Sequence, residues 1–181
     1  MRSTRSLQMD LDTSGIQSLM DQLADKLDEA ARPAAQAMAQ VVYERVKLNV
    51  SKLGKYTGNL DSSIYQAYSQ ARTSALGAPT YHVSWNPRKA PHGHLVEDGH
   101  WQRYAVVRTS KGWVTAVRPE MQGQPKPKRR ASPAEKDAYY VPHPGGPVYV
   151  AGKFFVRSAA SAFPEARAAA EQRLKQELDK A

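Results

Sequence analysis

The segment HGHLVEDGH, residues 92–100, has the residue types that could best support chemistry. It holds three of the five histidines of the chain, together with two acids. His92, His94, Glu97 and His100 are four potential ligands for zinc or another borderline metal ion. Their spacing mixes strand and helix periods, so no single regular backbone would bring all four together, and it differs from metallohydrolase helices with histidines at i and i+4. We therefore favour a local structural role and predict no metal and no cofactor.

Other catalytic patterns are also missing from the sequence. Glu97 and Asp98 are adjacent, which on a strand would send the two carboxylates to opposite faces. The chain has no cysteine, so thiolate chemistry and disulfides are excluded. We find neither a Gly-x-Ser-x-Gly turn nor a glycine-rich phosphate loop. The sequence predicts a protein that is not an enzyme.

Positive charge is concentrated in one part of the chain. The 26 Lys and Arg against 17 Asp and Glu give a net charge of +9, and residues 103–130 hold eight cations against the single acid Glu120. Such a field favours an acidic surface, whether nucleic acid or protein, although a solvated loop explains it equally well. Trp101, Tyr104 and Trp113 could stack bases, or could simply be core residues on strands. The cations that we consider as partner or DNA contacts are Arg118, Lys126, Lys128, Arg129 and Arg130.

The length of 181 residues and the 41% of hydrophobic residues predict a single globular domain, residues 1–181. The basic start of the chain is not followed by the apolar run of a secretory signal, and no stretch is apolar enough to span a membrane. We expect a soluble protein made in the cytoplasm, without a membrane partner.

The pattern of apolar residues predicts an α+β fold. Residues 13–50 form a helical arm with a kink or a fresh start at Pro33, because proline lacks the amide hydrogen of a helix interior. Residues 57–117 alternate as strands of a small antiparallel sheet, including a hairpin of RYAVVRT and GWVTAV. Residues 118–147, with seven prolines, are expected to be a long basic loop without a regular element. Residues 148–181 supply a last strand and a C-terminal helix, restarted at Pro164, that packs on the sheet.

Three segments in this order resemble the neck or tail-completion (head–tail joining) proteins of tailed bacteriophages, which are similar in kind to the minor tail protein Z of phage lambda. The first is YTGNLDSSI, the second is HLVEDGH and the third is VYVAGKFFVRSAASAF, followed by a terminal helix. The chain departs from the family pattern at Asp98, where an aromatic residue is usual, and at Lys153, where proline is usual. The residues that carry the resemblance, or a structural role that it implies, are Thr57, Gly58, Leu60, Ile64, Leu95, Glu97, Gly99, His100, Phe154, Phe155 and Arg157.

The resemblance implies roles for several of these residues. Thr57 and Asn59 would fix a turn in which Gly58 takes a conformation that bulkier residues avoid. Gly99 would turn the chain. Glu97 would accept hydrogen bonds from main-chain amides or from a cation such as Arg157.

The function that the resemblance implies is assembly. The protein would be a structural component of the virion, assembled in the host cytoplasm, that forms a ring, as a hexamer of about six copies, at the head–tail junction. Its partners would be its own copies, the head-completion or stopper protein, and the tail terminator or tail tube, with a further contact to channel DNA. The alternatives are a tail terminator, a basic nucleic-acid-binding module and a histidine-site metal-dependent hydrolase.

Overall fold

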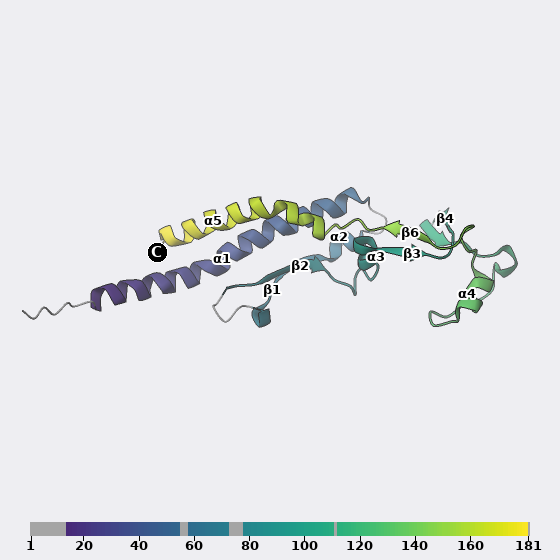
Figure 1. Ribbon diagram of the computed structural model, residues 1–181, viewed down its shortest axis with the longest axis horizontal. Helices are drawn as coiled ribbons and strands as arrows, with labels where there is room; N and C mark the ends of the chain where they lie inside the picture. The colour runs from purple at the N-terminus through teal and green to yellow at the C-terminus, as the bar shows by residue number, and fades with distance from the viewer. Residues whose placement is uncertain (1–13, 55–57, 73–77, 111, 181) are drawn as a thin grey trace, which may run out of the picture. The chain divides into compact units, whose positions relative to one another are not determined.

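The computed structural model describes residues 14–54, 58–72, 78–110 and 112–180. The α+β class predicted from the sequence is confirmed, with a long N-terminal helix, short antiparallel strands and a C-terminal helix (Figure 1). The chain divides into two compact units, each built from separate stretches of sequence. Unit 1 combines residues 1–43, 66–83 and 162–181, and unit 2 combines residues 44–65 and 84–161.

Helix α1 (Ser14–Lys52) contains Pro33 in its interior. Of the two alternatives predicted at this proline, the fresh start is therefore wrong, and the kink stays a prediction. Proline removes one main-chain hydrogen bond from the helix, but the residues around it are rich in alanine, which has the highest helix propensity. Ala30 and Ala34, on either side of Pro33, are both buried. Within unit 2, Val46 and Val50 of the same helix are buried, as their spacing of four predicted.

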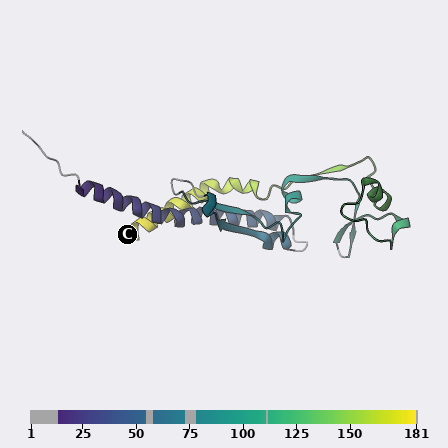
Figure 2. The same ribbon diagram turned by 90° about the horizontal axis from the view of Figure 1, so that it is seen from below.

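The C-terminal helix α5 (Phe163–Lys180) follows the 3-10 helix η3 (Arg157–Ala162), and Pro164 stands in its first turn, where its missing amide hydrogen costs little. This confirms the predicted restart. Within unit 1, α5 runs beside α1 (Figures 1 and 2), and its Arg173 lines a shallow depression with Pro33, Gln36 and Gln40. The partner that the structure shows for α5 is therefore α1, while its predicted packing on a sheet stays a prediction.

Among the residues that the structure describes, the strands form three separate two-stranded sheets instead of one small sheet, which corrects the sequence prediction. The pairs are β1 (Ile64–Tyr68) with β2 (Tyr81–Trp85), β3 (Gly99–Gln102) with β6 (Val148–Ala151), and β4 (Val106–Thr109) with β5 (Gly112–Thr115). The hairpin β4–β5 was predicted, including its glycine, since Gly112 has a φ of 113°.

Residues 118–147 contain regular structure, so the prediction of a loop without regular elements is wrong. They form the 3-10 helix η2 (Pro119–Met121) and helix α4 (Pro133–Tyr139). Ser132 and Glu135 make a capping box at the start of α4, in which each side chain bonds the other's main-chain amide. Tyr139 is buried, and its hydroxyl donates to the carbonyl of Gln124 at 2.9 Å. One cap and one buried ring thus order a segment whose composition suggested a loop.

Two short helices and one 3-10 turn complete the fold: α2 (Asn59–Ser63), α3 (Gly93–Asp98) and η1 (Gln70–Arg72). The core of unit 2 forms around Phe155, which is 1% exposed and meets Trp85 edge to face at 5.5 Å between ring centroids. Gly93 lies against the same indole, where an added Cβ would have no room. No helix in the described part of the chain is long and apolar enough to cross a membrane.

Candidate functional site

The buried carboxylate of Glu97 joins the second recognised segment to the third. Glu97 lies on α3 and is only 4% exposed. Its two oxygens accept hydrogen bonds from the main-chain amides of Val156 at 2.9 Å and Arg157 at 3.0 Å. These are the main-chain acceptor bonds expected from the sequence. Two hydrogen bonds from consecutive amides to one carboxylate fix the start of η3 against the end of α3, and we call this arrangement the Glu97 clasp.

Main-chain bonds extend the clasp on both sides. The amide of Lys153 donates to the carbonyl of Val96 at 2.7 Å, and the amide of Phe154 donates to the carbonyl of Glu97 at 3.1 Å. Strand β3 then continues the contact, because His100 pairs with Val150 in the antiparallel register of β3 and β6. Residues about fifty positions apart in the sequence are thereby held side by side.

Two glycines allow this close approach. Gly99 has a φ of 81°, and a Cβ added there would lie 2.6 Å from the carbonyl oxygen of Val150. A Cβ on Gly152 would lie 2.5 Å from the carbonyl oxygen of Glu97. Both positions therefore require glycine for lack of space, and Gly99 also requires it for its backbone conformation. Gly99 turns the chain as predicted.

Arg157 and Phe154 form the exposed side of the clasp. The guanidinium of Arg157 pairs with the carboxylate of Asp98, lies 3.9 Å from that of Glu97, and sits over the ring of Phe154 at 5.5 Å. Phe154 has a φ of 48°, which makes it the one residue other than glycine in the described chain with a positive φ. Such strain persists only where the surrounding contacts hold it, and here the clasp does so.

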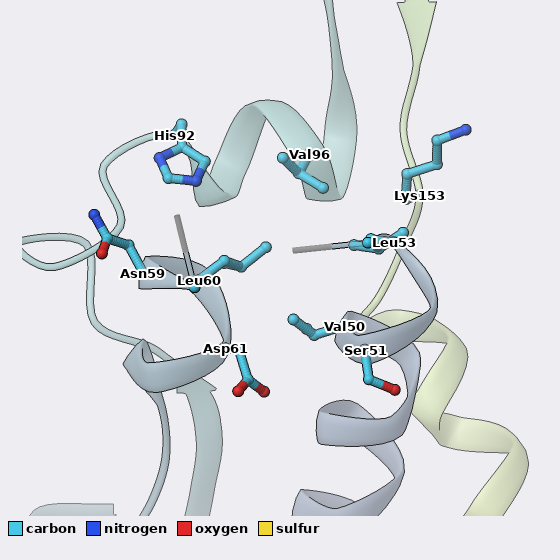
Figure 3. Close-up of a pocket in the computed structure, with 11 residues that line it drawn as sticks. Val50, Ser51, Leu53, Asn59, Leu60, Asp61, His92, Val96 and Lys153 are labelled. Atoms are coloured by element: carbon cyan, nitrogen blue, oxygen red, sulfur yellow. The ribbon is translucent and has the colours of Figure 1, made fainter. Parts of the chain in front are cut away.

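An apolar pocket of about 560 Å³ lies in unit 2 beside the clasp (Figure 3). Val50 comes from the last turn of α1, Leu53 from the turn directly after it, Leu60 from α2 and Val96 from α3. Figure 3 shows these four side chains around a common space. The remaining lining residues are Ser51, Gly54, Gly58, Asn59, Asp61, His92 and Lys153. Residues from all three recognised segments therefore meet at one pocket.

The first recognised segment has the backbone expected of it. Gly58 has a φ of 75° and precedes α2, so it adopts the left-handed conformation predicted from the sequence. Ile64 is buried at the start of β1, and Lys47 of α1 pairs with Asp61 at 2.7 Å. Thr57, which was expected to help fix the turn, lies outside the described residues.

The histidines do not converge. His92 stands at the start of α3 and lines the pocket, His94 is exposed on the same helix, and His100 is half-buried on β3. Nδ1 of His100 is buried without a hydrogen-bond partner among the described residues. No group of three or more potential metal ligands occurs in the part of the chain that the structure describes. The geometry thus provides no support for the hydrolase alternative.

The basic residues divide into two kinds. Lys126, Lys128, Arg129 and Arg130 are exposed. Arg118 instead bonds within the fold, since its Nε donates to the carbonyl of Asp137 at 3.0 Å.

A charged network centred on Asp137 of α4 also holds Arg103 in place. Asp137 accepts two bonds from Arg103, at 2.6 and 3.0 Å, and one from the hydroxyl of Tyr104 at 2.9 Å. These hydrogen bonds lower the pKa of the Asp137 carboxyl, and the bond from Arg103 has the larger effect. Burial, followed by the bond to Asp137, raises the pKa of the Tyr104 hydroxyl.

Several residues of the site were missed by sequence reasoning. Val50 was assigned only to the helical arm, Leu53 only to the break after it, and Lys153 was noted only as a departure from the family pattern. Asn49 donates to the carbonyl of Phe155 at 3.0 Å and to the hydroxyl of Ser158 at 2.9 Å, a contact spanning more than one hundred positions. No local signal identifies such a bond. The capping box was visible in the sequence as Ser-Pro-Ala-Glu at 132–135.

The fold and the site define a small α+β protein. In it, a buried carboxylate and two close-packed glycines hold the end of α3 against the start of η3, and an apolar pocket lies beside this contact. Residues 15–99 match the model of the HK97-gp10-like family, whose description reads "Bacteriophage HK97-gp10, putative tail-component". This stretch is slightly less than half of the chain and ends at Gly99, before the third recognised segment. The match supports a tail component of a tailed bacteriophage, and the similarity to lambda protein Z stays a prediction. Comparisons with curated proteins and with solved structures find no match.

Proposed function

We propose that this protein is a structural virion component of a tailed phage that joins the tail to the DNA-filled head as part of a ring. One observation carries the proposal: the three segments that resemble the neck and tail-completion proteins meet in unit 2, at the Glu97 clasp and the pocket beside it. The match of residues 15–99 to a tail-component family supports the same assignment. A fixed surface of this kind serves assembly, in which the contact itself is the function.

The ring requires heterologous contacts, in which one face of a subunit meets a different face of its neighbour. We infer closure at about six copies, a cyclic arrangement that ends the assembly without open faces. The ring would lie at the head–tail junction, between a head-completion or stopper protein and the tail terminator or tail tube. A tail terminator would perform a similar joining task from the tail side.

The test is electron microscopy of particles made by a phage that lacks this gene. We expect tail-less heads beside free tails, and complete particles when the wild-type gene is supplied in trans. Complete tailed particles without the gene would refute the proposal. A gold label on the supplied protein then separates a neck position from the end of a free tail, which would indicate a terminator.

A second candidate, contact with DNA, is favoured by exposed aromatic residues that precede and follow the basic stretch 103–130 in the sequence. Trp101 and Tyr149 face each other across β3 and β6 with ring centroids 5.4 Å apart, and Trp101 is 68% exposed. Exposed rings of this kind suit stacking on bases, and the exposed cations Lys126, Lys128, Arg129 and Arg130 suit contacts with phosphate.

The test for DNA contact is binding to duplex DNA at several salt concentrations, because each phosphate contact changes the slope of log K against log salt by about 0.9. We expect replacing Lys126, Lys128, Arg129 and Arg130 by alanine to flatten this slope by about 3.6 units if each contacts one phosphate. Replacement of Lys175 on α5 serves as the control and should leave the slope unchanged. Equal slopes for all variants would remove DNA from the partners of this region.

A further inference from the structure

The N-terminal part of α1 carries a row of large apolar side chains that the described chain leaves uncovered. Leu19, Met20, Leu23 and Leu27 recur at helical spacing and are 69%, 65%, 51% and 42% exposed. We call these four residues the α1 stripe. Every residue from Gln17 to Glu29 is exposed except Lys26, which is half-buried. This part of the helix therefore packs against almost nothing in the described part of its own chain.

A helix in this situation needs a partner. Isolated helices of about 12–15 residues are marginal in water, and most helix stability in proteins comes from burial of the apolar face. The α1 stripe has the spacing i, i+1, i+4 and i+8, which is the pattern of an amphipathic helix that lies in an apolar groove. The surface that covers the α1 stripe should thus be a groove with room for several leucine-sized side chains.

The pocket of unit 2 has these properties. Its space of about 560 Å³ is surrounded by Val50, Leu53, Leu60 and Val96 (Figure 3). Helix-in-groove recognition uses apolar walls of this kind, with polar groups restricted to the rim. The acid in its lining, Asp61, is already paired with Lys47.

Charge selects which surface the α1 stripe would meet. Residues 15–29 hold four acids and one lysine, in a chain whose net charge is +9. Two stripes facing each other would bring acid against acid, so pairing between identical segments is disfavoured. The pocket offers the opposite sign, because Lys153 lines it and the exposed Lys52 lies between two lining residues. An acidic helix with a leucine row therefore complements the pocket in both charge and polarity.

We propose that the α1 stripe of one copy of this protein docks in the unit 2 pocket of a second copy. The contact is heterologous, so each copy offers one helix and one pocket, and a series of such contacts closes when the rotation permits. The inference rests on the proposed ring function and deepens it by naming the two surfaces of the subunit contact.

The absence of cysteine from the chain allows a direct test by disulfide formation between two single-cysteine variants. One variant carries Leu23→Cys in the stripe, and the other carries Ser51→Cys in the pocket lining, a nearly isosteric change. One protein is isotope-labelled, the two are mixed and mildly oxidised, and mass spectrometry identifies the 23–51 disulfide. Because each chain holds one cysteine, a mixed disulfide can form only between copies.

The matched control is Ser18→Cys, which is also exposed but lies on the far side of the helix from the stripe. We expect the Leu23→Cys and Ser51→Cys mixture to yield at least about tenfold more mixed disulfide than Ser18→Cys with Ser51→Cys, the preference expected of a specific contact of 1.4 kcal/mol. The measurement is made on concentrated purified protein and on particles assembled with both variants.

Equal yields for the two mixtures in both settings would overturn the docking proposal. So would a disulfide from Leu23→Cys to a different virion protein without one to Ser51→Cys. The outcome is separable from that of the proposed function. If the gene deletion gives tail-less heads but the disulfide does not form, the docking contact alone is wrong. If the protein is absent from particles, the head–tail role is wrong whatever the disulfide yield.

Discussion

Replacing Glu97 by glutamine should destabilise unit 2 strongly, although the change alters only one atom of the side chain. In the wild type, both carboxylate oxygens accept from main-chain amides, at 2.9 and 3.0 Å, in a site where the side chain is almost fully buried. Glutamine keeps one acceptor oxygen and presents an NH₂ group to the other amide. One charge-assisted bond is lost, and a buried donor then faces another donor.

The expected cost follows from these two effects. A hydrogen bond to a charged group contributes about 1.5–3 kcal/mol, and an unsatisfied buried donor costs about 1–3 kcal/mol. Part of the second cost is relieved by small movements, so we expect a total loss of about 3 kcal/mol in the free energy of unfolding. With a urea slope of about 2 kcal/mol per M, the unfolding midpoint should fall by about 1.5 M. Hydrogen exchange of the Val156 and Arg157 amides should accelerate in parallel.

The control is Asp98→Asn, which removes the neighbouring carboxylate on the exposed side of the clasp. Asp98 pairs with Arg157, whose side chain is 65% exposed, and exposed ion pairs contribute less than about 1 kcal/mol. Its urea midpoint should therefore stay within about 0.5 M of the wild type. If Glu97→Gln and Asp98→Asn lowered the midpoint equally, the two amide bonds would not have the importance assigned to them here.

Three other perturbations test separate parts of the structure. Gly99→Ala should cost about 2–4 kcal/mol, because the new Cβ meets a carbonyl oxygen at 2.6 Å. Gly123→Ala, with a similar φ but open space, should cost only about 1 kcal/mol in the same urea titration. Ser132→Ala should cost about 1 kcal/mol and speed hydrogen exchange in α4, and unchanged exchange would argue against the capping box. Because its pKa is lowered, Asp137 stabilises the fold above the ordinary aspartate pKa, and this contribution is lost as the pH falls through the lowered value. The midpoint temperature of thermal unfolding should therefore fall more between about pH 7 and about pH 3 for the wild type than for Asp137→Asn. An equal fall for both proteins would contradict the role of Arg103 in lowering that pKa.

Elements with a local signal were predicted well from the sequence. The leucine and valine spacing identified α1, and the strand pattern around residues 106–115 identified the hairpin β4–β5. Glu97 was expected to accept main-chain hydrogen bonds, and its two amide partners confirm this. Each of these inferences depends on residues close in sequence or on a motif with a known pattern.

The failures have physical causes. Helix α4 was missed because its seven residues lie in a proline-rich segment, where composition outweighed the Ser132 cap. The fresh start at Pro33 was wrong because propensity and burial on both sides of the proline maintain the helix. The pairing of β3 with β6, and the pocket itself, depend on contacts between residues far apart in the chain. A single sequence contains no pattern that specifies such contacts.

The pairing of β3 with β6 has a consequence for how related chains can differ. Gln102 lies opposite Val148, so the whole stretch between them leaves and returns at one fixed point. The entropic cost of lengthening a closed loop is small, about 0.6 kcal/mol for each doubling. Related chains can therefore gain or lose many residues between 103 and 147 while the pairing of β3 with β6 is kept. Insertions, deletions and sequence differences among related proteins should therefore be concentrated between residues 102 and 148.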